Sequence, residues 1–303
     1  MTKDFLQITD FTRDEAIDVL NLCKDMKTGK SAPKPLLGKT VACIFHKPSL
    51  RTRISFEVGI NELGGNSLYI TDKEIQLGVR ESIYDVGKVL SRFVGMIMIR
   101  TFDHSHVEQL GRHATVPVVN GLTDLTHPCQ VMGDIFTYYE QTGKFEDITI
   151  AFLGDGNNVF NSFLNLACLF KFNLRLGTSE ATMPNQEILD KAKKAGKSQI
   201  EIVHDPKEAV RDADIIYTDV WASMGQKDKA EERAKLLSIF QVNNELLSHA
   251  SSDVRVMHCL PANRGQEITD EVIDGPHSVV FDEAENRLHI QKAIMATLLE
   301  SRK

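Results

Sequence analysis

The sequence predicts an α/β protein of two domains, each with a central, mainly parallel sheet flanked by helices. Its 303 residues are enough for two domains of ordinary size. Short β-rich runs alternate with runs of helical period along the chain, a pattern typical of βα units. The polar segment Gln141–Asp147 interrupts the alternation, which then restarts. We therefore expect a first domain over residues 1–140, a second over 147–283, and a terminal helix over 284–303 that packs back on the first domain.

The first half of the chain opens with a predicted helix that begins at the capping-box pair Thr12 and Glu15 and ends near Gly29. A strand over Thr40–Phe45 follows and runs into a helix that ends at Gly64. Apolar periodicity and a proline predict the other elements of this half: a helix with the stripe Ile83, Val86, Leu90 and Phe93, buried strands over Gly95–Arg100 and Val116–Asn120, and a helix from Pro128 through Tyr139.

The second half repeats the same alternation after the polar break. The β-rich runs of this half are ITIAFLGDG (148–156), NLRLGT (173–178), IEIV (200–203), DIIYTDVW (214–221) and VRVMHCLPA (254–262). Helices are expected from Asn157, near Asn185 to Ala195, and over 284–300.

Composition and charge exclude several classes of function. The net charge is −7 and the isoelectric point is near 5.8, whereas binding to nucleic acid or anionic membranes requires basic surface. No stretch approaches the roughly 20 apolar residues of a membrane span, and the N-terminus lacks the apolar run of a signal peptide. The five cysteines are scattered without a CxxC pair, which disfavours a disulfide framework or a zinc site. We expect a cytoplasmic protein.

The segment Lys47–Arg53 (KPSLRTR) follows a predicted strand and opens a predicted helix. The N-terminus of a helix presents unpaired N–H groups and a partial positive charge. Ser49 and Thr52 add hydroxyl donors and Arg51 adds a bidentate guanidinium, so the segment suits a phosphate group. It is not a Walker A loop, because the glycines of that loop are missing. The alternative is a capped helix with surface arginines.

Two further candidates lie at the ends of predicted elements in the first half. Arg100 ends an apolar strand, and ligands of open α/β folds bind at the C-terminal edge of the sheet. Its alternative is a solvated strand end. His127 and Gln130 lie at positions i and i+3 on one helix face, where an imidazole and an amide can donate to a carbonyl oxygen. Without further context, helix capping by Thr126 beside a structural histidine is the simpler interpretation.

Three features of the second half carry candidate chemistry. The turn Gly154–Asn158 (GDGNN) partly resembles GxGxxG, but Val159 replaces the third glycine and Glu180 is a weak candidate for the ribose-binding acid. Asp219 ends a strand, where a carboxylate can hold an ammonium group or accept its proton; the alternative is a helix cap. Cys259 also ends a strand, and the alternative is a structural buried cysteine.

Taken together, these segments resemble the aspartate/ornithine carbamoyltransferase family in order and spacing. The matching segments run from Lys47 to Ala293: SLRTR, Arg100, HPCQ, GDGNN, DVWASMGQ, HCLPA and FDEAENRLHIQKA. SLRTR and HPCQ resemble the carbamoyl-phosphate half shared by the whole family. DVWASMGQ and HCLPA resemble the acceptor half of members that use ornithine. The resemblance implies carbamoyl transfer from carbamoyl phosphate to the δ-amine of ornithine, which gives citrulline and phosphate for arginine biosynthesis.

The resemblance also implies roles for individual residues. It implies that the catalytic residues are Arg51, Thr52, Arg100, His127, Asp219 and Cys259. It implies that carbamoyl phosphate is bound by Ser49, the backbone of Leu50, Arg51, Thr52, Gln76 (from the same or a neighbouring subunit), Arg100, His127, Gln130, Cys259, the carbonyl of Leu260, and Arg287. It implies that ornithine is bound by Asn158, Asp219, Ser223 and Met224. No cofactor and no metal are implied, and the expected assembly is a homotrimer or an assembly of trimers.

Three positions depart from the common pattern of the family. Leu50 stands where threonine is common, Asn263 where histidine is common, and Lys227 where glutamate is common. The last two bear on the acceptor, so putrescine, an acylated ornithine and aspartate stay as alternatives to ornithine. From other classes, a nucleotide-binding Rossmann-type oxidoreductase built on GDGNN and a non-catalytic anion-binding subunit are the rivals.

Overall fold

The computed structural model describes residues 3–222 and 230–300 of the chain. The chain forms two compact units. Unit 1 comprises Met1–Gly133 and Glu285–Lys303, and unit 2 comprises Asp134–Ala284. Two helices contribute residues to both units: α6 (Pro128–Thr142) and α13 (Val280–Glu300). Within the described ranges, no helix is both long enough and apolar enough to cross a membrane.

Unit 1 is built on a four-stranded parallel sheet with the order β2-β1-β3-β4. Its strands are β1 (Thr40–Phe45), β2 (Asn66–Thr71), β3 (Met96–Arg100) and β4 (Val118–Leu122). The chain moves from β1 outward to β2 and then returns to the other side of β1 with β3. The loops after β1 and β3 therefore leave the same edge of the sheet in opposite directions, which is the geometry that creates a ligand site in open α/β sheets.

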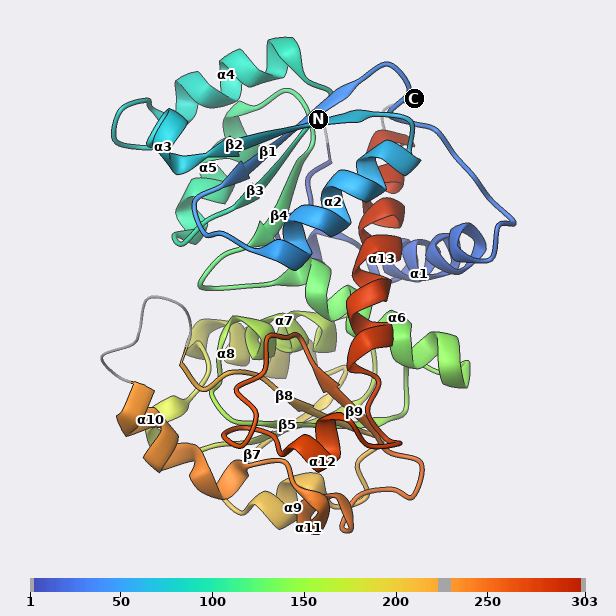
Figure 1. The fold of residues 1–303 in the computed structure, drawn as a ribbon, viewed down its shortest axis with the longest axis vertical. Helices are drawn as coiled ribbons and strands as arrows, with labels where there is room; N and C mark the ends of the chain where they lie inside the picture. The colour runs from blue at the N-terminus through green and yellow to red at the C-terminus, as the bar shows by residue number, and fades with distance from the viewer. Residues whose placement is uncertain (1–2, 223–229, 301–303) are drawn as a thin grey trace. The chain divides into compact units, whose positions relative to one another are not determined.

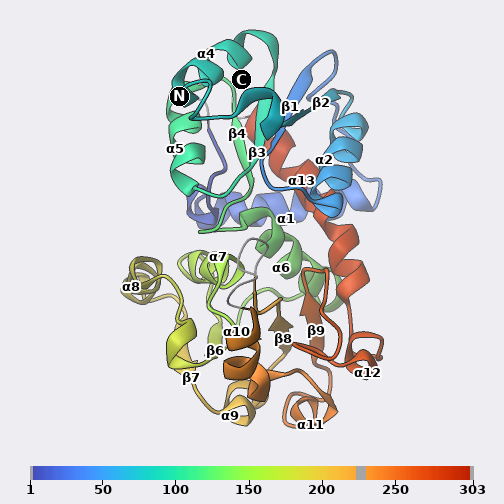
Figure 2. The ribbon, with the colours of Figure 1, turned by 60° about the vertical axis from the view of Figure 1, so that its left-hand side comes forward.

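Helices cover both faces of this sheet (Figures 1 and 2). They are α1 (Arg13–Lys27), α2 (Leu50–Glu62), α4 (Ile83–Phe93), α5 (His104–His113) and the part of α13 that belongs to unit 1, with the short α3 (Asp72–Ile75) after β2. Alternate strand residues such as Ile44 and Ile97 pack in one cluster with residues of α4 and α5. On α2, the absent side chain of Gly59 lets Leu288 and Lys292 of α13 approach closely.

Unit 2 is built on a five-stranded parallel sheet with the order β7-β6-β5-β8-β9. Its strands are β5 (Thr149–Leu153), β6 (Asn173–Gly177), β7 (Gln199–Val203), β8 (Ile215–Thr218) and β9 (Arg255–His258). Its remaining helices are α7 (Asn158–Ala167), α8 (Gln186–Ala195), α9 (Pro206–Val210), α10 (Ala230–Leu237), α11 (Asn244–Leu247) and α12 (Asp270–Ile273). The order reverses between β5 and β8, so the turn after β5 and the turn after β8 adjoin.

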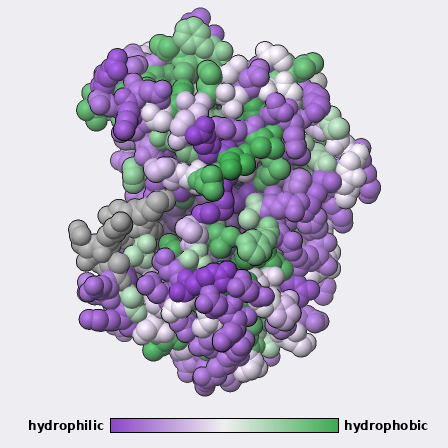
Figure 3. Space-filling model, viewed as in Figure 1, coloured by the Kyte–Doolittle hydropathy of each residue, from purple (hydrophilic) through white to green (hydrophobic). Residues whose placement is uncertain are grey.

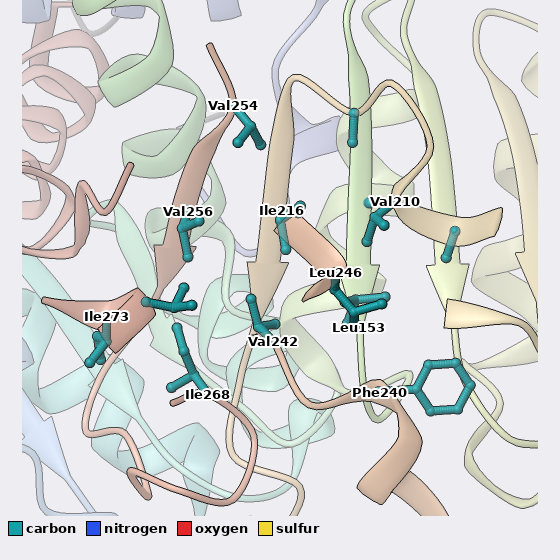
Figure 4. Packing of buried hydrophobic residues seen from close by; sticks show 14 of the residues in the cluster. Leu153, Val210, Ile216, Phe240, Val242, Leu246, Val254, Val256, Ile268 and Ile273 are labelled. Carbon is teal, nitrogen blue, oxygen red and sulfur yellow. The ribbon is translucent and has the colours of Figure 1, made fainter. Parts of the chain in front are cut away.

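One face of the second sheet packs on a continuous apolar cluster (Figure 4). Leu153, Ile216 and Val256 project from three adjacent strands toward Val242 and Ile268 of the segments that cover them. These side chains are buried, and each contributes roughly 1.5–3 kcal/mol by leaving water. The cluster fixes β8 and β9 side by side, with Thr218 opposite His258, so the residues that follow these strands emerge together.

The predicted two-domain α/β fold with parallel sheets is confirmed, and β1 has the predicted bounds. The terminal helix is longer than predicted, because it begins at Val280 rather than Ala284. The sequence did not predict strand β2 or helix α5. β2 lies at a sheet edge where Asn66 and Leu68 are exposed, so it lacks the continuous apolar run of the inner strands.

Candidate active site

The short segment that follows β1 leads directly into the N-terminus of α2. Ser49 is the N-cap of this helix, and its hydroxyl accepts a hydrogen bond from the Thr52 N–H at 3.3 Å. The Ser49 hydroxyl also donates to Oγ1 of Thr52 at 3.1 Å. A serine cap orients the first turn without adding negative charge, so the helix end stays suited to an anion.

The hydroxyl of Thr52 joins two buried arginines within unit 1. Nη1 of Arg100 donates to Oγ1 of Thr52 at 3.0 Å, and Nη2 of Arg287 donates to the same oxygen at 2.7 Å. Arg100 ends β3 and Arg287 comes from α13, so residues far apart in sequence converge on the first turn of α2. Arg100 also donates to the Lys47 carbonyl at 3.2 Å. Two guanidinium groups held beside a helix N-terminus form a strongly electropositive site.

His127 lies beside these cations at the start of α6 and is buried. Burial lowers the pKa of His127 well below its usual value, and the positive charges of Arg287, Arg100 and Lys47 lower it further. The imidazole is therefore neutral at physiological pH, and a neutral imidazole has one N–H that can donate to a carbonyl oxygen. Gln130, predicted on the same helix face, is also buried in unit 1.

The other predicted carbamoyl-phosphate residues of unit 1 lie at its surface or just below it. The Nε atom of Arg51 is buried and has no hydrogen-bond partner in the part of the chain that the structure describes, so this guanidinium has a donor to spare. The side chain of Leu50 is exposed, which leaves only its backbone for binding. Gln76 is exposed after α3 with a left-handed φ of 44°. Arg53 pairs instead with Glu57 at 2.9 Å.

In unit 2, the carboxylate of Asp219 is held by three donors where β8 ends. The Asn157 amide donates to Oδ2 at 2.7 Å, the Val220 N–H donates to Oδ1 at 2.7 Å, and the Cys259 thiol donates to Oδ1 at 3.0 Å. Asp219 is only 8% exposed, so a polar ligand that reached it would meet a fixed anion. The prediction from sequence did not include Asn157, whose side chain also caps α7 by accepting from the N–H groups of Val159 and Phe160.

Cys259 is a neutral thiol in this arrangement. Burial raises its pKa well above the usual value, and the Asp219 carboxylate raises it further. Such a cysteine is a hydrogen-bond donor and is neither a nucleophile nor a base at neutral pH. The next residue, Leu260, has a φ of 54°, which turns the chain sharply away from β9.

A buried network shapes this turn. The Leu260 N–H donates to Nδ1 of His258 at 2.9 Å, which places the imidazole proton on Nε2. That nitrogen lies 3.1 Å from Oε1 of Glu267, and both side chains are fully buried. The same carboxylate oxygen accepts the Asn263 N–H at 2.5 Å. His258 and Glu267 were not predicted from sequence, although His258 stands within the HCLPA motif.

Of the other residues predicted to bind the acceptor, Asn158 is the first residue of α7 and is half-buried. Ser223 and Met224 lie outside the described residues. Near the GDGNN turn, Asp155 forms an ion pair with Arg233 of α10. Burial raises the pKa of Asp155 to about 6 despite that pairing.

The structure offers little for a metal ion or a nucleotide. Across residues 3–222 and 230–300, one trio of potential ligands has its donor atoms within 4.8 Å: Asp219, His258 and Cys259. Both nitrogens of His258 already have partners in Leu260 and Glu267, so the trio lacks a free imidazole. In the GDGNN turn, a side chain at Gly156 would meet the backbone of Pro184. This glycine thus serves close packing within unit 2.

Each half of the chain matches a domain of one known protein family. Residues 3–140 match the carbamoyl-P binding domain of aspartate/ornithine carbamoyltransferases, and residues 146–298 match their Asp/Orn binding domain. The chain is 52% identical to ornithine carbamoyltransferase from Nitrobacter winogradskyi (98% of this chain, 97% of the relative) and 50% identical to that of Thermococcus kodakarensis (98% and 96%).

The fold comparison gives the same result. The structure of ornithine carbamoyltransferase from Pyrococcus furiosus superimposes with a TM-score of 0.93 at 45% identity, covering 100% of this chain and 98% of that one. The chain therefore belongs to the aspartate/ornithine carbamoyltransferase family, and it is an enzyme of the carbamoyltransferase class.

Proposed function

We propose that this enzyme transfers the carbamoyl group of carbamoyl phosphate to the δ-amine of ornithine, giving citrulline and phosphate. One observation carries the proposal most directly: Arg100 and Arg287 both donate to the Thr52 hydroxyl at the N-terminus of α2. This is a fixed set of donors for an anionic substrate with a carbonyl group. Two relatives that match nearly the full chain are named ornithine carbamoyltransferase. These matches support ornithine as the acceptor and disfavour a Rossmann-type oxidoreductase.

In this proposal unit 1 binds carbamoyl phosphate. Arg51 and the backbone N–H groups that begin α2 bind the phosphate, with Gln76 as a further contact. Thr52, Arg100 and neutral His127 donate to the carbonyl oxygen, which gains negative charge as the amine attacks. A preorganised donor of this kind is worth about 2.7–4 kcal/mol of barrier. Because the pKa of His127 is lowered, this residue polarises the carbonyl group by hydrogen bonding and keeps its proton.

Unit 2 binds the acceptor in this proposal. Asp219 has its carboxylate fixed by Asn157, Val220 and Cys259, and its charge attracts the ammonium form of the acceptor. The ammonium group loses one proton before the amine attacks, and Asp219 can accept it; the nitrogen loses a second proton once the C–N bond has formed, and the departing phosphate can accept that one. Cys259 keeps its own proton, because its pKa is raised, and orients the Asp219 carboxylate. The Leu260 carbonyl contacts the carbamoyl amide, while Asn158, Ser223 and Met224 contact the amino-acid end of the acceptor.

The test is a mass balance in solution. Purified protein with carbamoyl phosphate and ornithine should form citrulline and inorganic phosphate in equal amounts. Phosphate release without citrulline would contradict the acceptor assignment. No consumption of carbamoyl phosphate by folded protein would contradict the whole proposal and favour a non-catalytic anion-binding subunit.

We propose a homotrimer, or an assembly of trimers, on the evidence of an exposed apolar face in unit 1. Leu50, Ile54 and Val58 follow one another at helical spacing on α2 and are 70%, 50% and 41% exposed, and Leu68 of the edge strand β2 is 52% exposed. Apolar surface gathers over α2 in Figure 3. Such a patch marks an association surface, and exposed Gln76 can then reach a neighbouring copy.

Light scattering tests this assembly. We expect a mass about three times the 34.0 kDa of one chain, or a multiple of that, and Ile54→Asp should shift it toward the single chain. A monomer at micromolar concentration with full activity would contradict the proposal.

The cellular setting is also part of the proposal. Five free cysteines suit the reducing cytoplasm, and citrulline formation suits arginine biosynthesis. The chain should therefore restore growth without arginine to a bacterium that lacks this activity. Failure of an expressed, active protein to do so would favour the degradative direction.

A further inference from the structure

Unit 2 contains a buried pair of acids that the proposed function does not use. Asp134 of α6 and Glu283 of α13 are each 1% exposed, and their carboxyl groups are hydrogen-bonded to each other. The Tyr217 hydroxyl on β8 is fully buried and donates to Oε1 of Glu283 at 3.3 Å. Buried acids are rare unless they have specific partners, so this cluster requires an explanation.

A hydrogen bond between two carboxyl groups requires a proton. Burial raises the pKa of Glu283 well above its usual value, and the neighbouring Asp134 raises it further. Glu283 is therefore the partner that carries the proton, which it donates to Asp134. Its oxygens accept hydrogen bonds from the Tyr217 hydroxyl and from a backbone N–H group.

That N–H group belongs to His258, the last residue of β9. β9 is an edge strand, so every second N–H of this strand points away from β8. The Val256 N–H on that side is paired with the His277 carbonyl at 2.8 Å. Two residues later the His258 N–H is paired with Oε2 of Glu283 at 2.9 Å. Glu283 thus supplies the last contact along the free edge before the chain turns at Cys259 and Leu260.

We infer that Glu283, held by Asp134 and Tyr217, is a positioning residue that fixes the end of β9 so that the Cys259 thiol reaches Asp219. The effect passes through the His258 backbone and needs no contact with substrate. The inference deepens the proposed function, and it rests on that function for the role of Cys259 and Asp219 in turnover. The geometry of the thiol can be measured without turnover.

Comparing Glu283→Gln with Glu283→Ala distinguishes a positioning role of Glu283 from a role in general packing. Glutamine keeps an oxygen for the His258 N–H and an N–H for Asp134, so it mimics the protonated acid. Alanine removes both. In Glu283→Ala we expect kcat to fall by about 30-fold or more, because misplacement by about 1 Å costs on the order of 100-fold. The affinity of unit 1 for carbamoyl phosphate should change by less than about threefold. Glu283→Gln should recover most of kcat.

Thiol labelling gives the second measurement, in a Cys168→Ala background because Cys168 is the other cysteine that is not fully buried. In Glu283→Ala the Cys259 thiol loses its fixed contact with Asp219, so it should react with a chromogenic disulfide about tenfold faster or more. Peptide mass analysis identifies the labelled residue. Asp282→Asn is the matched control, because Asp282 is exposed, precedes Glu283, and hydrogen-bonds only to Gln141 within the part of the chain that the structure describes. It should leave both measurements unchanged.

The outcomes are distinct. Wild-type kcat and labelling in folded Glu283→Ala would overturn the inference, and so would equal impairment of Glu283→Gln and Glu283→Ala. If Glu283→Ala does not fold, Tyr217→Phe replaces it, and this variant should raise labelling by about threefold; an unchanged rate overturns the inference. If the wild type forms no citrulline, the proposed function fails, and the labelling rates still decide the positioning role.

Discussion

Replacing Asp219 with asparagine removes one negative charge from unit 2 and preserves the shape of the side chain. In the native protein Oδ1 of Asp219 accepts from the Val220 N–H and the Cys259 thiol, and Oδ2 accepts from Asn157 at 2.7 Å. An asparagine that keeps its oxygen at the Oδ1 position turns its NH₂ group toward the NH₂ group of Asn157. One charge-assisted hydrogen bond is lost, at about 1.5–3 kcal/mol, and the acceptor ammonium loses its counter-charge at a similar cost.

The Asn157 hydrogen bond is lost from the free enzyme as well, so it lowers stability. The lost counter-charge alone lowers kcat/KM for ornithine, by about 1.5–3 kcal/mol or roughly 10- to 150-fold. The affinity for carbamoyl phosphate should stay within about twofold, because the charged side chains proposed to bind this substrate belong to unit 1. The assay measures citrulline with ornithine varied at saturating carbamoyl phosphate, and titration calorimetry measures carbamoyl-phosphate binding alone. Asp282→Asn, an exposed acid of the same unit, is the control for the charge change. Equal losses in both affinities would refute the assignment of Asp219 to the acceptor.

Three further predictions concern unit 1. Arg51→Ala should raise KM for carbamoyl phosphate by about tenfold or more, because one charged hydrogen bond is worth about 1.5–3 kcal/mol; near-normal turnover at low carbamoyl phosphate would exclude the anion role. Thr52→Val should leave the Arg100 and Arg287 donors facing a methyl group and lower the free energy of unfolding by about 3 kcal/mol, measured by urea denaturation; an unchanged midpoint would contradict this. Because the pKa of His127 is lowered in the folded protein, the unfolded chain takes up a proton below about pH 6.5 that the folded chain does not. Stability should therefore fall as pH drops below that value, less steeply in His127→Gln, and equal slopes would count against a buried neutral imidazole.

The sequence predicted the fold well where strands are buried on both faces. β3 and β8 are fully buried strands; Arg100 ends β3, and Asp219 directly follows β8. The sheet order brings each of these residues to the edge where open α/β sheets bind ligands. The prediction missed β2, because an edge strand with Leu68 exposed carries a weaker signal. Which strands become neighbours is a property of the sheet order, and no local pattern reveals it.

The candidate site could be located from the sequence only in part, for the same reason. The segment proposed to bind phosphate is local, so Ser49, Arg51 and Thr52 could be chosen from one helix start. The acceptor half depends on contacts between distant segments. Asn157 and Asn158 are adjacent identical residues, and only the structure shows that the Asn157 amide reaches Asp219. The pairing of Asp134 with Glu283 likewise joins two helices that are far apart in the chain, and their burial follows from packing.

The most direct test of the central claim is a competition among acceptors at pH 8. Labelled carbamoyl phosphate would be supplied with equal concentrations of ornithine, putrescine, N-acetylornithine and aspartate, and the carbamoylated products would be separated and counted. We predict that citrulline carries nearly all of the label, which would show that Asn263 and Lys227 are compatible with ornithine as the acceptor. A dominant product from any other amine would retain the carbamoyl-phosphate site in unit 1 and contradict the acceptor assignment in unit 2.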